Sequence, residues 1–237
     1  MTTTETQHDV RFPAESPEYR KQRDDLLRAE IELRRHEEQV SAQRRTLPLG
    51  GEVPTDYVFD EWDRATDTVR QVRLSELFED GKDTLFFYSH MFVAGERGVP
   101  LEVACPSCTS INDAIDGEVR HITQSINYAV CAKVPIEQFR AHSDARGWRN
   151  LRLLSSANNT YNVDYHAEDA DGNQLPIANV FVRPDGATRH FWASELMFVA
   201  SEPGQDPRHV DFMWPLWAVL DRTPEGRDDF HPSLAYP

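Results

Sequence analysis

With 237 residues, 39% of them hydrophobic, the chain can bury a sizeable core in one decorated domain or in two small ones. Its 40 acidic and 25 basic residues give a net charge of -15, which argues against nucleic acid as a partner because phosphate backbones require concentrated Lys and Arg. No apolar run approaches a bilayer-spanning length and no signal-peptide pattern is present, so we expect a cytoplasmic protein without a membrane partner.

The N-terminal part of the chain predicts a polar tail followed by a long helix. Residues 1–14 are polar, and we expect them to form a flexible tail. Within the expected helical segment 15–50, Ser16 is a typical cap and Pro17 suits the first position of a helix that should end near Arg45. Apolar residues recur every seven positions, at Tyr19, Leu26, Leu33 and Val40. Such a narrow stripe suits packing on the protein's own core and homodimer formation equally, so both interpretations stay open.

Strand and helix patterns alternate through residues 51–237, which we expect to form the main domain with a C-terminal helical extension. Strands are predicted at 57–62, 69–73, 84–92, 127–134, 151–155, 179–183 and 188–192, helices at 75–78, 106–124, 135–147 and 211–220, and a short helix or an irregular turn at 161–166. The run 84–92 is rich in β-branched and aromatic residues, as in a strand buried on both faces of a sheet. Pro135 is expected at the first position of its helix, and Asp211 as the cap of the last helix. The order, a βαβαβ unit followed by a ββ hairpin, predicts an α/β domain with a central mixed sheet and helices on both faces.

Two of the three cysteines form the motif Cys105-Pro106-Ser107-Cys108, placed after the expected central strand and at the start of a helix. Three cysteines are too few for a disulfide scaffold, so the motif indicates redox catalysis or metal binding. The unpaired N–H groups and partial positive charge of a helix N-terminus favour the thiolate form. We therefore expect Cys105, exposed before the first turn, to attack a disulfide, and Cys108, pointing inward, to resolve the mixed disulfide. Pro106 suits the first helical position because it needs no N–H partner there, and the exchange needs no cofactor.

Two blander interpretations of the motif have to be weighed against this one. It could be half of a zinc site completed by His90, His121 or Cys131, although the sequence has no second C-x-x-C and no paired-histidine motif. It could also be a fortuitous pair without chemistry. Cys131 lies in an apolar run and is expected to be a small buried hydrophobe. His90 and His121 are expected to be structural, whereas His190 could line a cleft.

Several motifs, together with the order of elements, carry a resemblance to a known family. They are SPEYR at 16–20, CPSCTS at 105–110, LLSS at 153–156, RHF at 189–191 and LDRTPEGR at 220–227. The chain resembles, from Phe12 to Tyr236, an uncharacterised bacterial family of thioredoxin-like proteins usually described as predicted dithiol-disulfide oxidoreductases. The resemblance implies a thioredoxin-like fold with Cys105 as attacking thiol and Cys108 as resolving thiol.

The departures from better-known thioredoxins concern the surroundings of the motif. In those proteins the strand leads almost directly into a tryptophan-flanked C-x-x-C, whereas here residues 93–104 intervene and are expected to form a loop. Thioredoxins also place a cis-proline opposite the cysteines, for which Pro176 is the nearest candidate. A peroxiredoxin would have threonine three residues before its reactive cysteine, and Glu102 holds that position before Cys105.

The sequence is therefore compatible with three classes of function. The prediction is a thiol-disulfide oxidoreductase whose partner is a disulfide-containing protein or a small thiol. The alternatives are a thiol peroxidase of the peroxiredoxin type and a non-catalytic thioredoxin-like binding protein. The sequence leaves the substrate, the reductant and the direction of exchange open.

Overall fold

The computed structural model describes residues 8–93, 103–202, 208–228 and 230–236. The chain divides into two compact units, of which one ends at Pro48 and the other begins at Leu49. Each unit is described by itself below.

The first unit consists mainly of α1 (Pro17–Arg45), whose bounds are those predicted. The Ser16 hydroxyl accepts a hydrogen bond from the Tyr19 backbone N–H at 3.1 Å, and Pro17 occupies the first turn, where its missing N–H costs nothing. Residues 1–7 of the expected flexible tail lie outside the described part of the chain. The guanidinium of Arg20 binds Glu15 before the helix and Asp24 one turn further along it. These ion pairs attach the preceding segment to the first turns of α1.

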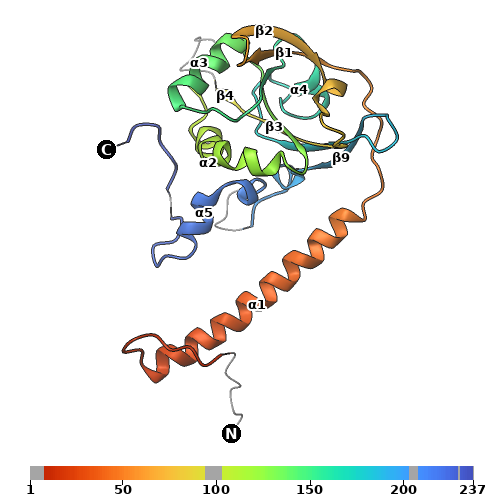
Figure 1. Cartoon of the computed structure of the whole chain (residues 1–237). Coiled ribbons are helices and arrows are strands. Elements are labelled where there is room, and N and C mark those ends of the chain that lie inside the picture. The colour runs from red at the N-terminus through yellow and green to blue at the C-terminus, as the bar shows by residue number, and fades with distance from the viewer. Residues whose placement is uncertain (1–7, 94–102, 203–207, 229, 237) are drawn as a thin grey trace. The chain divides into compact units, whose positions relative to one another are not determined.

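The second unit is built on a mixed sheet, which has seven strands in the part of the chain that the structure describes (Figure 1). The strands are β1 (Val58–Asp63), β2 (Thr68–Arg73), β3 (Thr84–Ser89), β6 (Asn127–Ala132), β7 (Leu153–Ser155), β8 (Ala178–Val182) and β9 (Arg189–Ala193), in the spatial order β2-β1-β7-β6-β3-β8-β9. β3, β6 and β7 run parallel, whereas β8, β9, β1 and β2 pair antiparallel with their neighbours. Helices connect the parallel strands, as such crossovers require. The predicted α/β fold with a central mixed sheet is confirmed.

Two apolar clusters lie on the two faces of this sheet. α2 (Pro106–Ile122), α3 (Ile136–Arg146) and α5 (Pro215–Leu220) contribute to the first cluster, and the 3-10 helix η1 (Leu74–Leu77) and α4 (Tyr161–Asp164) contribute to the second. Successive residues of a strand point to opposite faces, so β6 supplies both clusters. Tyr128, Val130 and Ala132 belong to the first cluster, and Ala129 and Cys131 to the second. The sheet is therefore covered on both faces, as predicted.

Three local predictions are wrong, and the last of them has a stereochemical reason. The run 84–92 is not one strand: β3 ends at Ser89, and Phe92 belongs to β4 (Phe92–Val93), which pairs with β5 (Val103–Ala104) in a separate sheet. Pro135 is the N-cap of α3 and not its first helical residue. The expected helix 211–220 is interrupted. A 3-10 helix, η3 (Asp211–Met213), is followed by Trp214 and then by α5, because a residue that precedes proline is disfavoured in the α conformation.

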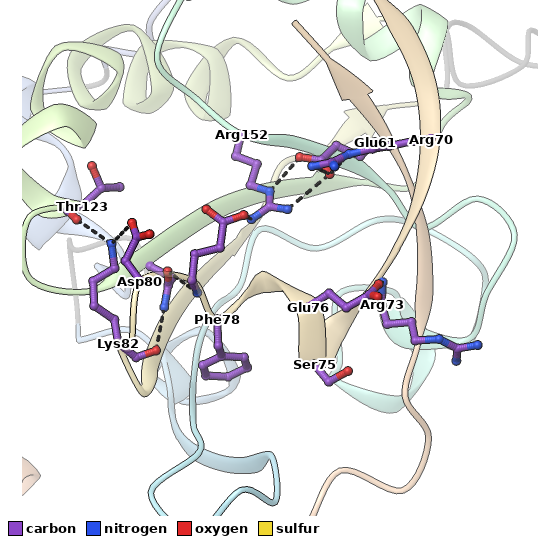
Figure 2. A network of polar contacts seen from close by, with 12 residues as sticks. Glu61, Arg70, Arg73, Ser75, Glu76, Phe78, Asp80, Lys82, Thr123 and Arg152 are labelled. Carbon is purple, nitrogen blue, oxygen red and sulfur yellow. Dashed lines mark hydrogen bonds and ion pairs between the residues drawn. The ribbon is translucent and has the colours of Figure 1, made fainter. Parts of the chain in front are cut away.

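A buried carboxylate joins the antiparallel edge of the sheet to the parallel part (Figure 2). Glu61 on β1 is 5% exposed and accepts hydrogen bonds from Arg152 at 2.7 Å and from Arg70 at 3.0 Å. Arg152 also binds Glu79 at 2.7 Å, at a more exposed position. Because a buried charge requires a partner, Glu61 and Arg152 fix β1 beside the start of β7.

Candidate active site

A short hairpin returns the chain to the end of β3 before the C-x-x-C motif begins. In this hairpin, Phe92 pairs with Ala104, and the Cys105 backbone N–H donates to the Met91 carbonyl at 3.0 Å. Residues 94–102 of the expected loop, Glu102 among them, lie outside the described part of the chain. The pairing places Cys105 beside the carboxyl end of the central strand, although the motif does not follow that strand directly.

The motif opens α2 in the way the sequence predicts. Cys105 is the N-cap, Pro106 is the first helical residue, and the Thr109 N–H donates to the Cys105 carbonyl at 2.9 Å. The prediction that Cys105 is exposed is wrong. Its relative exposure is 8% and that of Cys108 is 1%, and both thiols are free. Cys105 is covered by side chains that come from the C-terminal part of the chain, as described below.

The two thiols of the motif differ in acidity. The Cys108 side chain donates to the Cys105 sulfur, and this contact, joined by the N–H groups of Cys108 and Ser107, lowers the pKa of Cys105 to about 6 against the opposing effect of burial. Burial, reinforced by the nearby negative charge of Cys105, raises the pKa of Cys108 well above its ordinary value. Near neutral pH the pair therefore holds one thiolate at the mouth of the helix and one thiol behind it. This division suits an attacking and a resolving cysteine.

Tyr88, near the end of β3, is a neighbour of the motif that the sequence analysis did not single out. Its side chain is fully buried in the same apolar cluster as Cys108. Burial also raises the pKa of Tyr88 well above its ordinary value, so the phenol stays protonated. The alternation of side chains along β3 was the available signal, because it directs Tyr88 to the face that α2 covers.

A cavity of about 360 Å³ lies directly over the motif. Cys105, Ser107 and Cys108 form part of its wall, and Pro176 forms another part. The remaining lining comes mainly from the C-terminal part of the chain: Arg208, His209, Val210, Asp211, Trp214, Trp217, Arg227, Asp228, Phe230 and His231. Pro176 thus lies at the motif, but the prediction of a cis-proline is wrong, because no peptide bond in the described residues is cis.

The histidines and the third cysteine that the sequence analysis considered lie elsewhere. His90 is buried behind α2, where its Nδ1 accepts from Asn112 at 2.9 Å. His190 lines a second cavity and donates to Asn179 at 3.0 Å. Cys131 is fully buried in the opposite cluster, as expected for a small hydrophobe, and burial raises its pKa to about 12. Among the residues that the structure describes, no three His, Cys, Asp or Glu side chains gather as a metal-binding group. His121 lies in the last turn of α2.

Within the described residues, every helix is too short or too polar to cross a lipid bilayer.

Comparison with known proteins gives a family match and a set of similar structures. No curated protein sequence matches the chain. The sequence profile of a family described as "Bacterial protein of unknown function (DUF899)" matches residues 9–235. Similar solved structures include the reduced 2-Cys peroxiredoxin of Plasmodium vivax, with 15% identity, a TM-score of 0.46, and coverage of 70% of this chain and 95% of that one. Peroxidoxin BcpB from Mycobacterium tuberculosis has 16% identity, a TM-score of 0.42, and coverage of 70% and 94%. A cysteine-to-serine mutant of Xanthomonas campestris peroxiredoxin Q has 10% identity, a TM-score of 0.44, and coverage of 62% and 84%.

Proposed function

This chain belongs to the DUF899 family of bacterial proteins of unknown function, and we propose that it is a thiol-disulfide oxidoreductase. The observation that carries the proposal is the asymmetry of the motif. The pKa of Cys105 is lowered to about 6 at the start of α2, while Cys108 stays protonated beside it. A thiol with a pKa near or below the ambient pH supplies the thiolate that attacks a disulfide sulfur.

The exchange takes place in two displacements. In the first, the Cys105 thiolate attacks one sulfur of a disulfide R–S–S–R, forms a mixed disulfide and releases one thiolate RS⁻. The Cys108 proton passes to that leaving group. In the second, the Cys108 thiolate attacks the Cys105 sulfur, closes the Cys105–Cys108 disulfide and releases the second sulfur as a thiolate RS⁻, which takes its proton from water. Two electrons pass from the protein to the substrate, and a dithiol reductant restores the reduced motif.

Alkylation of the reduced protein with limiting iodoacetamide, mapped by mass spectrometry, tests the assignment of roles. We expect label on Cys105 first, because it is the thiol with the lowered pKa. Cys105→Ser should remove fast labelling and exchange, whereas Cys108→Ser should attack a disulfide and then remain in a mixed disulfide. Cys131→Ser, the control for a buried cysteine on the other face of the sheet, should change neither. Preferential labelling of Cys108 or Cys131, or stoichiometric zinc that protects both motif cysteines, would contradict the proposal.

Assays on the wild-type protein and the same cysteine variants distinguish the proposed function from the two alternatives. Rapid consumption of hydrogen peroxide that depends on Cys105, with no exchange on disulfides, would assign a thiol peroxidase instead. A motif whose reduction potential cannot be measured against a thiol buffer would indicate a non-catalytic binding protein.

A further inference from the structure

The C-terminal part of the chain forms a cover over the motif, which we define as residues 208–228 and 230–231. Four apolar residues of this cover, Val210, Met213, Trp214 and Trp217, are buried in the same cluster as Cys105 and Cys108. α5, which belongs to the cover, lies beside α2 (Figure 1). The cover is therefore part of the packed core and not a loosely attached end.

Hydrogen bonds attach the cover to two other parts of the second unit. The indole N–H of Trp214 donates to the Ser110 hydroxyl at 3.0 Å, on the helix that carries the motif. His209 Nε2 donates to the carbonyl of Pro176, which lines the cavity, at 2.8 Å. The cover is therefore attached both to α2 and to the segment before β8.

Ion pairs within the cover hold its shape. Arg227 binds Asp211 at 2.8 Å and Asp221 at 2.7 Å, and Arg208 binds Asp221 at 2.9 Å. The Arg227 guanidinium also lies over the Trp217 ring, 4.8 Å from its centroid. The two arginines are thus paired with carboxylates of the same segment, and the cavity wall also carries the aromatic rings of Trp214, Trp217 and Phe230.

We infer that the substrate of the motif is a disulfide of low molecular weight and not a disulfide of a folded protein. The inference rests on the proposed exchange function. Exchange requires the Cys105 sulfur to approach the substrate in line with its S–S bond, yet Cys105 is only 8% exposed and lies inside the cavity. A volume of about 360 Å³ is within the range of small-molecule sites. A small disulfide can enter the cavity and pack against Trp214 and Trp217. A disulfide on the surface of a folded protein is kept away from the Cys105 sulfur by the cover.

Competition between two kinds of disulfide tests this inference on the reduced full-length chain. The probes are bis(2-hydroxyethyl) disulfide and insulin, and each rate constant is divided by the rate constant of the same disulfide with free dithiothreitol. Oxidation can be followed by the fluorescence of the tryptophans that line the cavity. We expect the normalised rate constant for the small disulfide to be at least about tenfold larger, a typical steric discrimination.

A substitution in the cover and a matched control sharpen the test. Phe230 lines the cavity, packs on Trp217 with ring centroids 6.3 Å apart, and is 50% exposed, so that Phe230→Ala widens the entrance without opening a core cavity. It should raise the normalised rate with insulin, relative to that with the small disulfide, by about tenfold. Phe198→Ala removes a ring that is 52% exposed and lines the other cavity, and it should change neither rate.

Each outcome bears on one proposal or on both. Equal normalised rates in the wild-type protein would overturn the inference about the substrate and leave the exchange function intact. A Phe230→Ala protein that keeps the wild-type thermal transition and the wild-type rate with insulin would overturn the role of the cover. If neither disulfide oxidises the motif while both thiols remain free to titrate, the exchange function fails and the inference fails with it. If Phe230→Ala does not fold, the wild-type ratio alone decides.

Discussion

Removing the Cys108 side chain should raise the pKa of Cys105, because the Cys108 thiol is the largest cause of its low value of about 6. A hydrogen bond to a charged group contributes about 1.5–3 kcal/mol, and 1.36 kcal/mol corresponds to one pH unit, so Cys108→Ala should raise the pKa by about 1 to 2 pH units. The remaining N–H groups of Ser107 and of residue 108 keep it from rising further. At pH 7 the thiolate fraction of Cys105 should fall from about nine-tenths to between about a half and a tenth.

The rate of alkylation by excess iodoacetamide, measured across the pH range, reports this pKa directly. The wild-type rate should rise as pH passes through about 6 and then level off, because the thiolate is the reacting form. Cys108→Ser is the matched control, since its hydroxyl still donates to the Cys105 sulfur, and its profile should stay close to the wild-type one. A Cys108→Ala profile that also keeps its midpoint near the wild-type value would refute the reasoning and assign the low pKa to the helix N-terminus alone.

Two further predictions concern stability and assembly. Glu61→Ala leaves Arg152 without its buried partner and should lower the free energy of unfolding by about 3 kcal/mol in urea denaturation, whereas Glu79→Ala, at the exposed end of the same network, should cost less than about 1 kcal/mol. Equal losses would show that burial at Glu61 does not govern the network. We also propose that the stripe on α1 joins two chains. Light scattering should then give about twice the 27.2 kDa of one chain, and a single-chain mass that persists at high concentration would contradict this.

Several features that the sequence predicts correctly have local causes. The cap at Ser16 and the proline after it set the start of α1, and Pro106 sets the start of α2. The interruption of the last helix was also a local matter, since Pro215 disfavours an α conformation at Trp214, and that signal was overlooked. The burial of Cys105 is of another kind. It depends on side chains about a hundred residues further along the chain. The sequence shows that these side chains are apolar, but it does not show that they pack over the motif.

Because the three cysteines are distributed over the two faces of the sheet, the folded protein can form only some of the possible disulfides. Cys105 and Cys108 lie in one apolar cluster, and Cys131 lies in the other, behind a continuous layer of hydrogen-bonded strands. A covalent link between Cys131 and the motif cannot form while this layer is intact, because sulfur atoms must come within bonding distance. Such a link, found in protein recovered from oxidatively stressed cells, would indicate that the sheet was disrupted when the disulfide formed.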